Sequence, residues 1–310
     1  MRVYRWSTMM KNPLKYIHSY PVRTKQILGI SYNQFLKLVQ QAEFSHQQRK
    51  AEIERSKVRV NLRGGGRKPK LTIAEEVCLS LFYLRQMPTF EILGMHFDVS
   101  KTEANDTFHY WLKIFRGILP ASLLEQVEER VADYAIVQEL LTEFELIVDS
   151  YEQPRERPED NNEQQQYFSG KKKRHTFKSQ VVSMPKAQDI VDVVVGAKGS
   201  TSDISLFRSQ LSKFAPTQSF QGDKAYVGGK NIATPHKKPR NRELTVEQKA
   251  ENKVFSSQRI FVEHMIRLLK IFRIASERFR LHSDTYKQII FTVCGLVRLR
   301  IGSLVLPDLS

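Results

Sequence analysis

The chain has 310 residues, enough for one large domain or two smaller ones with a sizeable core. Hydrophobic residues make up 41% of it, a globular proportion that excludes a disordered chain. Lys and Arg number 49 against 33 Asp and Glu, which gives a formal net charge of +16. This excess indicates a polyanionic partner. The lack of a basic amphipathic terminal helix or a lipidation motif favours nucleic acid over a membrane surface.

The two cysteines, Cys78 and Cys294, lie in apolar helical contexts. They are interpreted as buried thiols, which suits a reducing compartment better than a disulfide or a metal site. The N-terminal residues contain no apolar run of signal-peptide length, and the run "IIFTVCGLV" near the C-terminus is too short to span a bilayer. We therefore expect a soluble, intracellular protein without a membrane partner.

The first part of the chain is predicted to be helical. Residues 31–57 carry apolar residues at helical spacing and then become a charged, solvated helix. The stretch "RGGGRKPK", residues 63–70, is rich in Gly, Lys and Arg and is interpreted as a flexible basic linker. It also resembles short Arg-Gly arms that enter the DNA minor groove, an alternative that stays open.

A helix-turn-helix pattern follows the linker. Thr72 with Glu75 forms a capping-box pattern that predicts a helix, and Pro88 ends it. A short helix over 89–96, a turn, and a helix over 100–115 with its own capping box complete the pattern. The last helix would enter the major groove with its outward side chains, Lys101, Thr102, Asn105 and His109. A helical bundle without DNA contact fits the pattern equally well, and the net charge favours DNA.

In the second half of the chain, β-branched runs typical of strands appear between segments with the helical spacing of apolar residues. The runs "FELIVDS", "HTFKSQVVSM" and "QDIVDVVVGAKGS" are β-branched and predict strands, and "SFQGDKAYVGG" predicts a strand that enters a Gly-rich turn. Helices are predicted in "TSDISLFRSQLSKF", in "SQRIFVEHMIRLLK" and in "YKQIIFTVCGLVRLRIG". Strands followed by helices indicate an α/β or α+β fold from about residue 140 onward.

Three acids stand out by their position. Asp149 follows an apolar strand, Asp223 follows another, and sites in α/β sheets gather at the carboxyl ends of strands. Glu263 is the only acid in the segment 257–273. Helical phase places it with Arg259 and Lys270 in a narrow stripe beside a broad apolar face. Taken singly, each acid is explained as well by a turn or by a surface ion pair.

At these residues the chain resembles the DDE transposases of bacterial insertion sequences, in the branch related to Harbinger-like transposases. Four stretches carry the resemblance in order, "LIVDSYEQPRERP", "YFSGKKKRHTFKSQVV", "GDKAYVGG" and "RIFVEHMIRLLK". The helix-turn-helix stretch is similar to the DNA-binding region of the same family. One departure is Ser256, where a related signature has Tyr. The second and third acids lie 40 residues apart, which leaves little room for the insertion domain of some relatives.

The resemblance implies a helical region over 1–62, the linker over 63–70, a helix-turn-helix region over 71–135, and a ribonuclease-H-like mixed-sheet domain over 140–305. It implies Asp149, Asp223 and Glu263 as the catalytic acids, which would bind two divalent cations, Mg²⁺ or Mn²⁺. The implied partners are double-stranded DNA, as element terminal inverted repeats and as target, and at least a second copy of the chain on DNA. A bacterial, cytoplasmic protein that associates with the nucleoid when bound to DNA is expected.

A basic run and two cations of the late helix are the further candidate DNA contacts. The run supplies Lys171, Lys172, Lys173, Arg174 and Lys178, and the helix supplies Arg259 and Lys270. Phosphate contacts of this kind are independent of sequence and depend on salt. A solvated charge run and structural ion pairs are the alternatives. A regulator that has lost catalysis, or a nuclease that cuts without joining, remains the alternative to a transposase.

Overall fold

The computed structural model describes residues 12–56 and 69–308, so most of the proposed basic linker lies outside the described residues. The chain forms two compact units. The first contains Met1–Leu119, Phe272–Ile274 and Leu304–Ser310, and the second contains Pro120–Ile271 and Ala275–Ser303. Each unit is described by itself. Within the described residues, no helix combines the length and apolar character that a bilayer-spanning segment needs.

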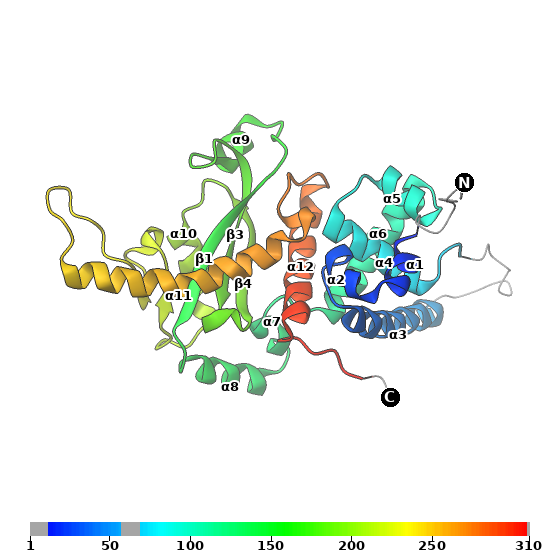
Figure 1. Cartoon of the computed structure of the whole chain (residues 1–310), viewed down its shortest axis with the longest axis horizontal. Coiled ribbons are helices and arrows are strands. Elements are labelled where there is room, and N and C mark those ends of the chain that lie inside the picture. Colours follow the sequence, from blue (N-terminus) through cyan, green and yellow to red (C-terminus); the bar gives the residue numbers. More distant parts are fainter. Residues whose placement is uncertain (1–11, 57–68, 309–310) are drawn as a thin grey trace, which may run out of the picture. The chain divides into compact units, whose positions relative to one another are not determined.

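The first unit is helical (Figure 1). Its helices are α1 (Pro13–Ser19), η1 (Pro21–Arg23), α2 (Thr24–Ile27), α3 (Tyr32–Ser56), α4 (Ile73–Gln86), α5 (Phe90–Phe97) and α6 (Lys101–Ile118). The capping box of Thr72 and Glu75 opens α4 as predicted. The Ser100 hydroxyl accepts the Glu103 N–H at 3.1 Å and caps α6. The predicted three helices are therefore confirmed, with ends shifted by a few residues.

A tight turn joins α5 to α6. Asp98 ends α5 in the left-handed conformation, and the Val99 N–H donates to the Gly94 carbonyl at 3.0 Å. A Cβ atom at Gly94 would lie 2.5 Å from the Val99 carbonyl oxygen, so only glycine fits there. Trp111 on α6 is fully buried, and its Nε1–H donates to Glu76 of α4 at 2.8 Å. These contacts fix the short helix-turn-helix.

The second unit is built on a mixed sheet (Figure 1). Its strands are β1 (Leu146–Pro154), β2 (Phe168–Ser169), β3 (Arg174–Ser183), β4 (Ile190–Lys198), β5 (Phe220–Gln221) and β6 (Ile232–Ala233). Strand β3 is antiparallel to β1, β2 and β4, whereas β5 is parallel to β1 and β6. The predicted α/β class with a mixed sheet is confirmed.

Helices cover this sheet. The α-helices are α7 (Leu123–Val127), α8 (Val131–Leu141), α9 (Asn161–Tyr167), α10 (Asp203–Gln210), α11 (Val246–Lys270) and α12 (Tyr286–Ile301). Short 3-10 turns are η2 (Pro185–Ala187), η3 (Leu211–Lys213), η4 (Lys224–Tyr226), η5 (Arg273–Ala275) and η6 (Ser283–Thr285). Val148, Phe207 and Phe220 belong to one apolar core. The ring of Tyr286 stacks on Phe177 with centroids 4.0 Å apart, which seats α12 on the sheet.

Strand β1 is longer than the sequence indicated. Asp149 was expected at the end of this strand, but β1 continues through Pro154 because it pairs with β3 from Ile147 to Pro154. Its other neighbour, β5, pairs with it only at Leu146 and Ile147. Asp149 therefore lies just beyond the point where β5 stops, beside an open edge of the strand.

A buried arginine ties the last helix to the sheet. Arg298 of α12 is fully buried, and it binds Asp189 through Nε at 2.7 Å and Nη2 at 2.9 Å. Its other N–H groups donate to the carbonyls of Pro120 and Ser122 and to the side chain of Gln126. The thiols of Cys78 in the first unit and Cys294 in the second are buried, as predicted, and neither is part of a disulfide.

Candidate active site

Asp149 is the most buried of the three predicted acids. Its side chain is 17% exposed, and the Ser150 N–H donates to its Oδ1 at 2.8 Å. Burial raises the pKa of Asp149 to about 6, against the lowering effects of the Ser150 N–H and of Arg259. The charges of Asp223 and Glu263 raise it further. The three acids thus lie within electrostatic reach of one another, although they come from distant parts of the chain.

Asp223 lies directly after β5. Its carboxylate accepts the Ala225 N–H at 2.8 Å and caps the η4 turn. The expected strand-end position is therefore correct. The cap fixes the carboxylate at the start of a turn, which the parallel pairing of β5 with β1 holds beside Asp149.

Glu263 lies on α11 at the edge of its buried face. Val262, Met265, Ile266 and Leu269 form that face, while the Glu263 side chain is 54% exposed. Arg259 Nη2 lies 3.4 Å from Glu263 Oε1 and 3.7 Å from Asp149 Oδ2. One guanidinium group thus bridges the first and third acids. The i,i+4 spacing indicated its pair with Glu263, but no pattern in the sequence indicated its reach to Asp149. The Nε atom of Arg259 is buried and has no hydrogen-bond partner.

A buried polar network joins the neighbours of the two aspartates. The hydroxyls of Ser150, next to Asp149, and of Tyr226, in the turn that Asp223 caps, lie 2.8 Å apart. The Gln180 amide of β3 donates to both, at 3.1 Å and 3.0 Å. Gln210 of α10 in turn donates to the Gln180 carbonyl oxygen. The network couples strand β1 to the η4 turn, and sequence reasoning missed it because no spacing pattern marks it.

A cleft of about 710 Å³ opens beside the acids. Asp149 and Glu263 line it, with Ala225 of the turn that Asp223 caps. The lining cations are Lys171, Lys172, Lys178, Arg267 and Lys270. Burial, and to a lesser degree the charge of Lys172, lowers the pKa of Lys270, whose ammonium lies 5.5 Å from the ring centroid of Tyr151. The cleft thus presents carboxylates next to a basic wall.

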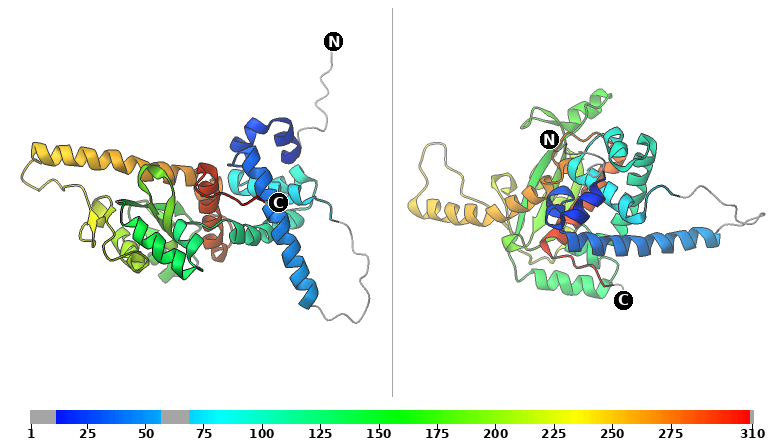
Figure 2. Two further views of the ribbon diagram at one scale, coloured as in Figure 1. Left: turned by 90° about the horizontal axis from the view of Figure 1, so that it is seen from below. Right: turned by 45° about the vertical axis from the view of Figure 1, so that its right-hand side comes forward.

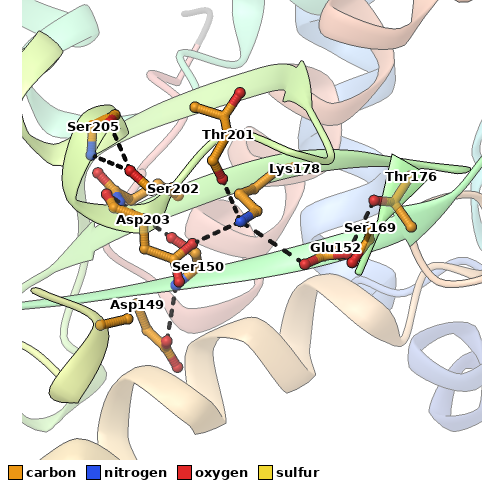
Figure 3. Close-up of polar contacts among 12 residues, drawn as sticks. Asp149, Ser150, Glu152, Ser169, Thr176, Lys178, Thr201, Ser202, Asp203 and Ser205 are labelled. Carbon is orange, nitrogen blue, oxygen red and sulfur yellow. Dashed lines mark hydrogen bonds and ion pairs between the residues drawn. The ribbon is translucent and has the colours of Figure 1, made fainter. Parts of the chain in front are cut away.

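Lys178 differs from the other residues of the predicted basic run. It was expected as an exposed phosphate contact, but only 8% of its surface is exposed. Its ammonium lies 3.1 Å from Asp203 Oδ1 and 3.9 Å from Glu152 Oε1, and it donates to the Thr201 carbonyl at 2.5 Å (Figure 3). The Lys178 ammonium is therefore paired with two carboxylates and a carbonyl, because the pleat of β3 turns its side chain toward α10. Asp203, left outside the predicted set, lines the cleft with it.

The other four residues of the run lie on the surface. Lys171, Lys172, Lys173 and Arg174 are exposed and form the turn from β2 into β3. Lys173 takes the left-handed conformation, with φ of 53°, that this turn requires. The turn brings Lys171 and Lys172 to the rim of the cleft. A basic ridge near the strand of Asp149 was expected, and the structure has one.

The outward side of α6 carries the expected helix-turn-helix residues. Lys101 and Thr102 are exposed, while Asn105 and His109 are half-buried. Burial lowers the pKa of His109, whose ring lies 5.2 Å from that of Phe108. The Asn105 amide donates to Asp106 at 3.3 Å. These side chains belong to the first unit and the acids to the second.

Comparison with known families agrees with this division. Residues 148–298 match the family described as DDE superfamily endonuclease, and residues 69–121 match its helix-turn-helix. A relative from Microchaete diplosiphon, the probable transposase for insertion sequence element IS702, is 33% identical over 219 residues. That alignment covers 69% of this chain and 76% of the relative. The chain belongs to the DDE superfamily of endonucleases. Nearly all of its mixed sheet, from β1 to β6, lies within the matched residues.

Two solved structures show only a weak likeness to this DDE endonuclease. One is a pre-cleavage Mos1 transpososome, at 11% identity over 73% of this chain and 84% of that chain, with a TM-score of 0.18. The other is a Mos1 transposase paired-end complex with the left transposon end, at 12% identity over 75% and 88%, with a TM-score of 0.21. Scores this low carry no structural argument.

The acids suit a hard divalent cation, although their side chains do not form a ready cage. Among the residues that the structure describes, no three His, Cys, Asp or Glu side chains lie close enough to hold a metal ion. Instead the cationic Arg259 lies between Asp149 and Glu263. Carboxylate oxygens are the ligands that Mg²⁺ and Mn²⁺ prefer. The donor set therefore fits such a metal, with Arg259 standing in for positive charge.

Proposed function

We propose that this DDE endonuclease is a DNA transposase that cuts at the ends of its element and joins the freed ends to target DNA. The observation that supports the proposal is that Asp149 and Glu263 line one cleft with a basic wall, while the charge of Asp223 also acts on Asp149. Acids and bases gathered at one cleft suit a phosphodiester, whose charge needs cations and whose cleavage needs an activated water.

Two divalent cations, Mg²⁺ or Mn²⁺, would be held by the three acids. Asp149, Asp223 and Glu263 would supply the carboxylate oxygens that hold them. When bound, such ions activate a water and stabilise a leaving oxygen. Arg259 would move aside or turn to a phosphate, which its long ion-pair distances of 3.4 Å and 3.7 Å and its unpartnered Nε support.

The bonds made and broken balance in both reactions. In the first, a water oxygen attacks the phosphorus at the element end, the bond from phosphorus to the 3′-oxygen breaks, and that oxygen gains a proton. In the second, the 3′-hydroxyl attacks a target phosphorus, loses its proton and displaces the target's 3′-oxygen. One phosphodiester replaces another, so no covalent intermediate with the enzyme is needed.

DNA would be held by two surfaces. Lys171, Lys172, Lys173, Arg174 and Lys270 would contact phosphates near the cut. Lys101, Thr102 and Asn105 of α6 would read the major groove at the element ends. The protein would act as a homodimer or a larger assembly when bound to DNA, since two ends must be brought together. It would work in the bacterial cytoplasm, on the nucleoid.

Labelled duplexes of candidate element ends with Mg²⁺ or Mn²⁺ test this function. Wild type is expected to cut and then to join, and alanine at Asp149, Asp223 or Glu263 is expected to abolish cutting while duplex binding persists. Alanine at Glu159, an exposed acid of the same unit, is the matched control and should leave both activities intact. A wild type that binds without cutting would indicate a regulator. One that cuts without ever joining would indicate a nuclease.

A further inference from the structure

The connection between the second and third acids is a projecting arm. No residue from 227 to 261 is buried, and all of them are described. The arm, residues 234–257, consists of a loop and the first turns of α11, and it extends away from the sheet of its own unit (Figures 1 and 2). Helix α11 first reaches the core at Val262, one residue before Glu263. The sheet therefore gains no buried surface from the arm.

The arm is nevertheless ordered by its own contacts. Thr245 and Gln248 form a capping box that opens α11. The loop is fastened to the helix at His236, whose N–H donates to the Asn252 side chain at 2.8 Å and whose carbonyl accepts from it at 3.2 Å. The His236 ring also lies 2.6 Å from Glu251. An isolated helix without a buried face has marginal stability in water, so this part of α11 is expected to bind a partner.

Charge indicates the class of partner. Residues 235–242, "PHKKPRNR", carry four Lys or Arg and no acid. Lys237, Lys238, Arg240 and Arg242 are all exposed. Only one of them, Lys238, has an ion pair in the structure, with Glu243. An exposed cationic tip complements a polyanion, and the endonuclease family supplies DNA as the polyanion at hand.

The topology sets where that DNA would lie. The arm begins 11 residues after Asp223 and ends 6 residues before Glu263, so it connects the second acid to the third. At 1.5 Å per residue, the exposed part of α11 spans about 24 Å, which is about seven base-pair steps of duplex. The arm's tip thus reaches DNA that lies well beyond the phosphate being cut.

We propose that residues 234–257 form a second DNA-binding site, which holds the phosphate backbone of duplex DNA about seven base pairs from the cleavage position. The inference rests on the proposed function and extends it. It assigns the arm a sequence-independent role, because contacts from Lys and Arg to phosphates carry no sequence information.

Salt dependence of duplex binding tests this site in the full chain. The variant K237Q/R240Q removes two tip cations, and K186Q/K287Q removes two exposed cations elsewhere in the same unit. The slope of log K against log salt is expected to weaken by up to about 1.8 for the arm variant, at about 0.9 per phosphate contact, and to stay unchanged for the control. Hydroxyl-radical protection about seven base pairs from the cut should be lost in the arm variant alone.

Two results would overturn the site. One is a slope and a footprint equal to wild type in the arm variant while wild type still cuts DNA. The other result combines two variants. V246S/V254S would change the molecular mass of the assembly in solution, and K237Q/R240Q would leave the slope of log K against log salt equal to wild type. That result would assign the exposed Val246 and Val254 side chains, and hence the arm, to contact with a second copy. Failure of the proposed function looks different, since wild type itself would then bind without cutting.

Discussion

Two arginine–aspartate pairs of the second unit, Arg298 with Asp189 and Arg259 with Asp149, are built differently. Arg298 is fully buried, binds Asp189 at 2.7 Å and 2.9 Å, and spends its remaining N–H groups on carbonyl and amide oxygens. Arg259 lies beside a cleft, reaches Asp149 only at 3.7 Å, and leaves its Nε without a partner. The first pair is a complete structural joint. The second is longer, lies beside a cleft and leaves one guanidinium nitrogen without a hydrogen-bond partner.

The largest expected effect comes from breaking the structural joint. Asp189→Asn leaves the Arg298 charge buried without its counter-charge, and it should lower the free energy of unfolding by about 3–5 kcal/mol. Urea denaturation measures this. Glu156→Gln breaks the exposed pair of Glu156 with Arg278 and should leave the midpoint unchanged. An Asp189→Asn variant with the free energy of unfolding of wild type would show that the buried pair is no more important to stability than an exposed one.

The same substitution at the acid site should have the opposite effect on stability. The raised pKa of Asp149, about 6, means that its contribution to stability is lost as pH rises through 6. Asp149→Asn removes that buried charge, so the variant should be more stable than wild type at pH 8, by up to about 3 kcal/mol, and the difference should fall to about half at pH 5 and close below about pH 4. Cleavage should fall more than about 100-fold. Melting curves at both pH values that favour wild type would contradict this account.

A smaller effect is expected from the network beneath the acids. Tyr226→Phe removes the hydroxyl that lies 2.8 Å from Ser150 and so loosens the turn of Asp223 relative to β1. The affinity for Mn²⁺ should weaken about 10–100-fold, as it does when other groups that orient metal ligands are removed. The decrease of the paramagnetic signal of free Mn²⁺ on binding measures this affinity. Tyr134→Phe, which removes a hydroxyl bonded to the Lys213 carbonyl, is the control. Equal Mn²⁺ affinity in the two variants would remove the positioning role.

The smallest effect is a displacement of the pH profile. Arg259 lowers the pKa of Asp149, so Arg259→Gln should raise it above the wild-type value near 6. The acid limb of the cleavage profile should then move to higher pH, since Asp149 must be ionised to act. Lys186→Gln, which changes an exposed cation elsewhere in the same unit, should leave the limb in place. If the acid limb of the cleavage profile stays at the same pH in Arg259→Gln, ionisation of Asp149 does not determine the position of that limb.

Much of the fold could be predicted because local rules decide it. Thr72 and Ser100 mark their helices by capping, and the apolar face from Val262 to Leu269 marks the buried part of α11. The turns of α11 before residue 257 bury nothing and have no apolar period, so the capping pattern of Thr245 and Gln248 is the local signal that marks their start, and the predicted helix began only at Ser257. The length of β1 was also hidden, because pairing with β3 carries it past Asp149.

The site was predictable in its acids more than in its cations. Asp149, Asp223 and Glu263 were identified by position and family resemblance. Whether a lysine is exposed depends on the pleat of its strand and on what lies opposite, and at Lys178 that is Asp203. Likewise, the reach of Arg259 to Asp149 depends on how α11 crosses β1, which no local pattern contains.

The two buried cysteines give the protein a built-in chemical reporter. Cys78 lies in the first unit and Cys294 in the second, and neither thiol is exposed. A maleimide therefore cannot modify either one until the unit around it opens. Peptide mapping after timed labelling would give separate opening rates for the two units from one unmodified sample. Added DNA that slows labelling at only one cysteine would identify the unit that it stabilises.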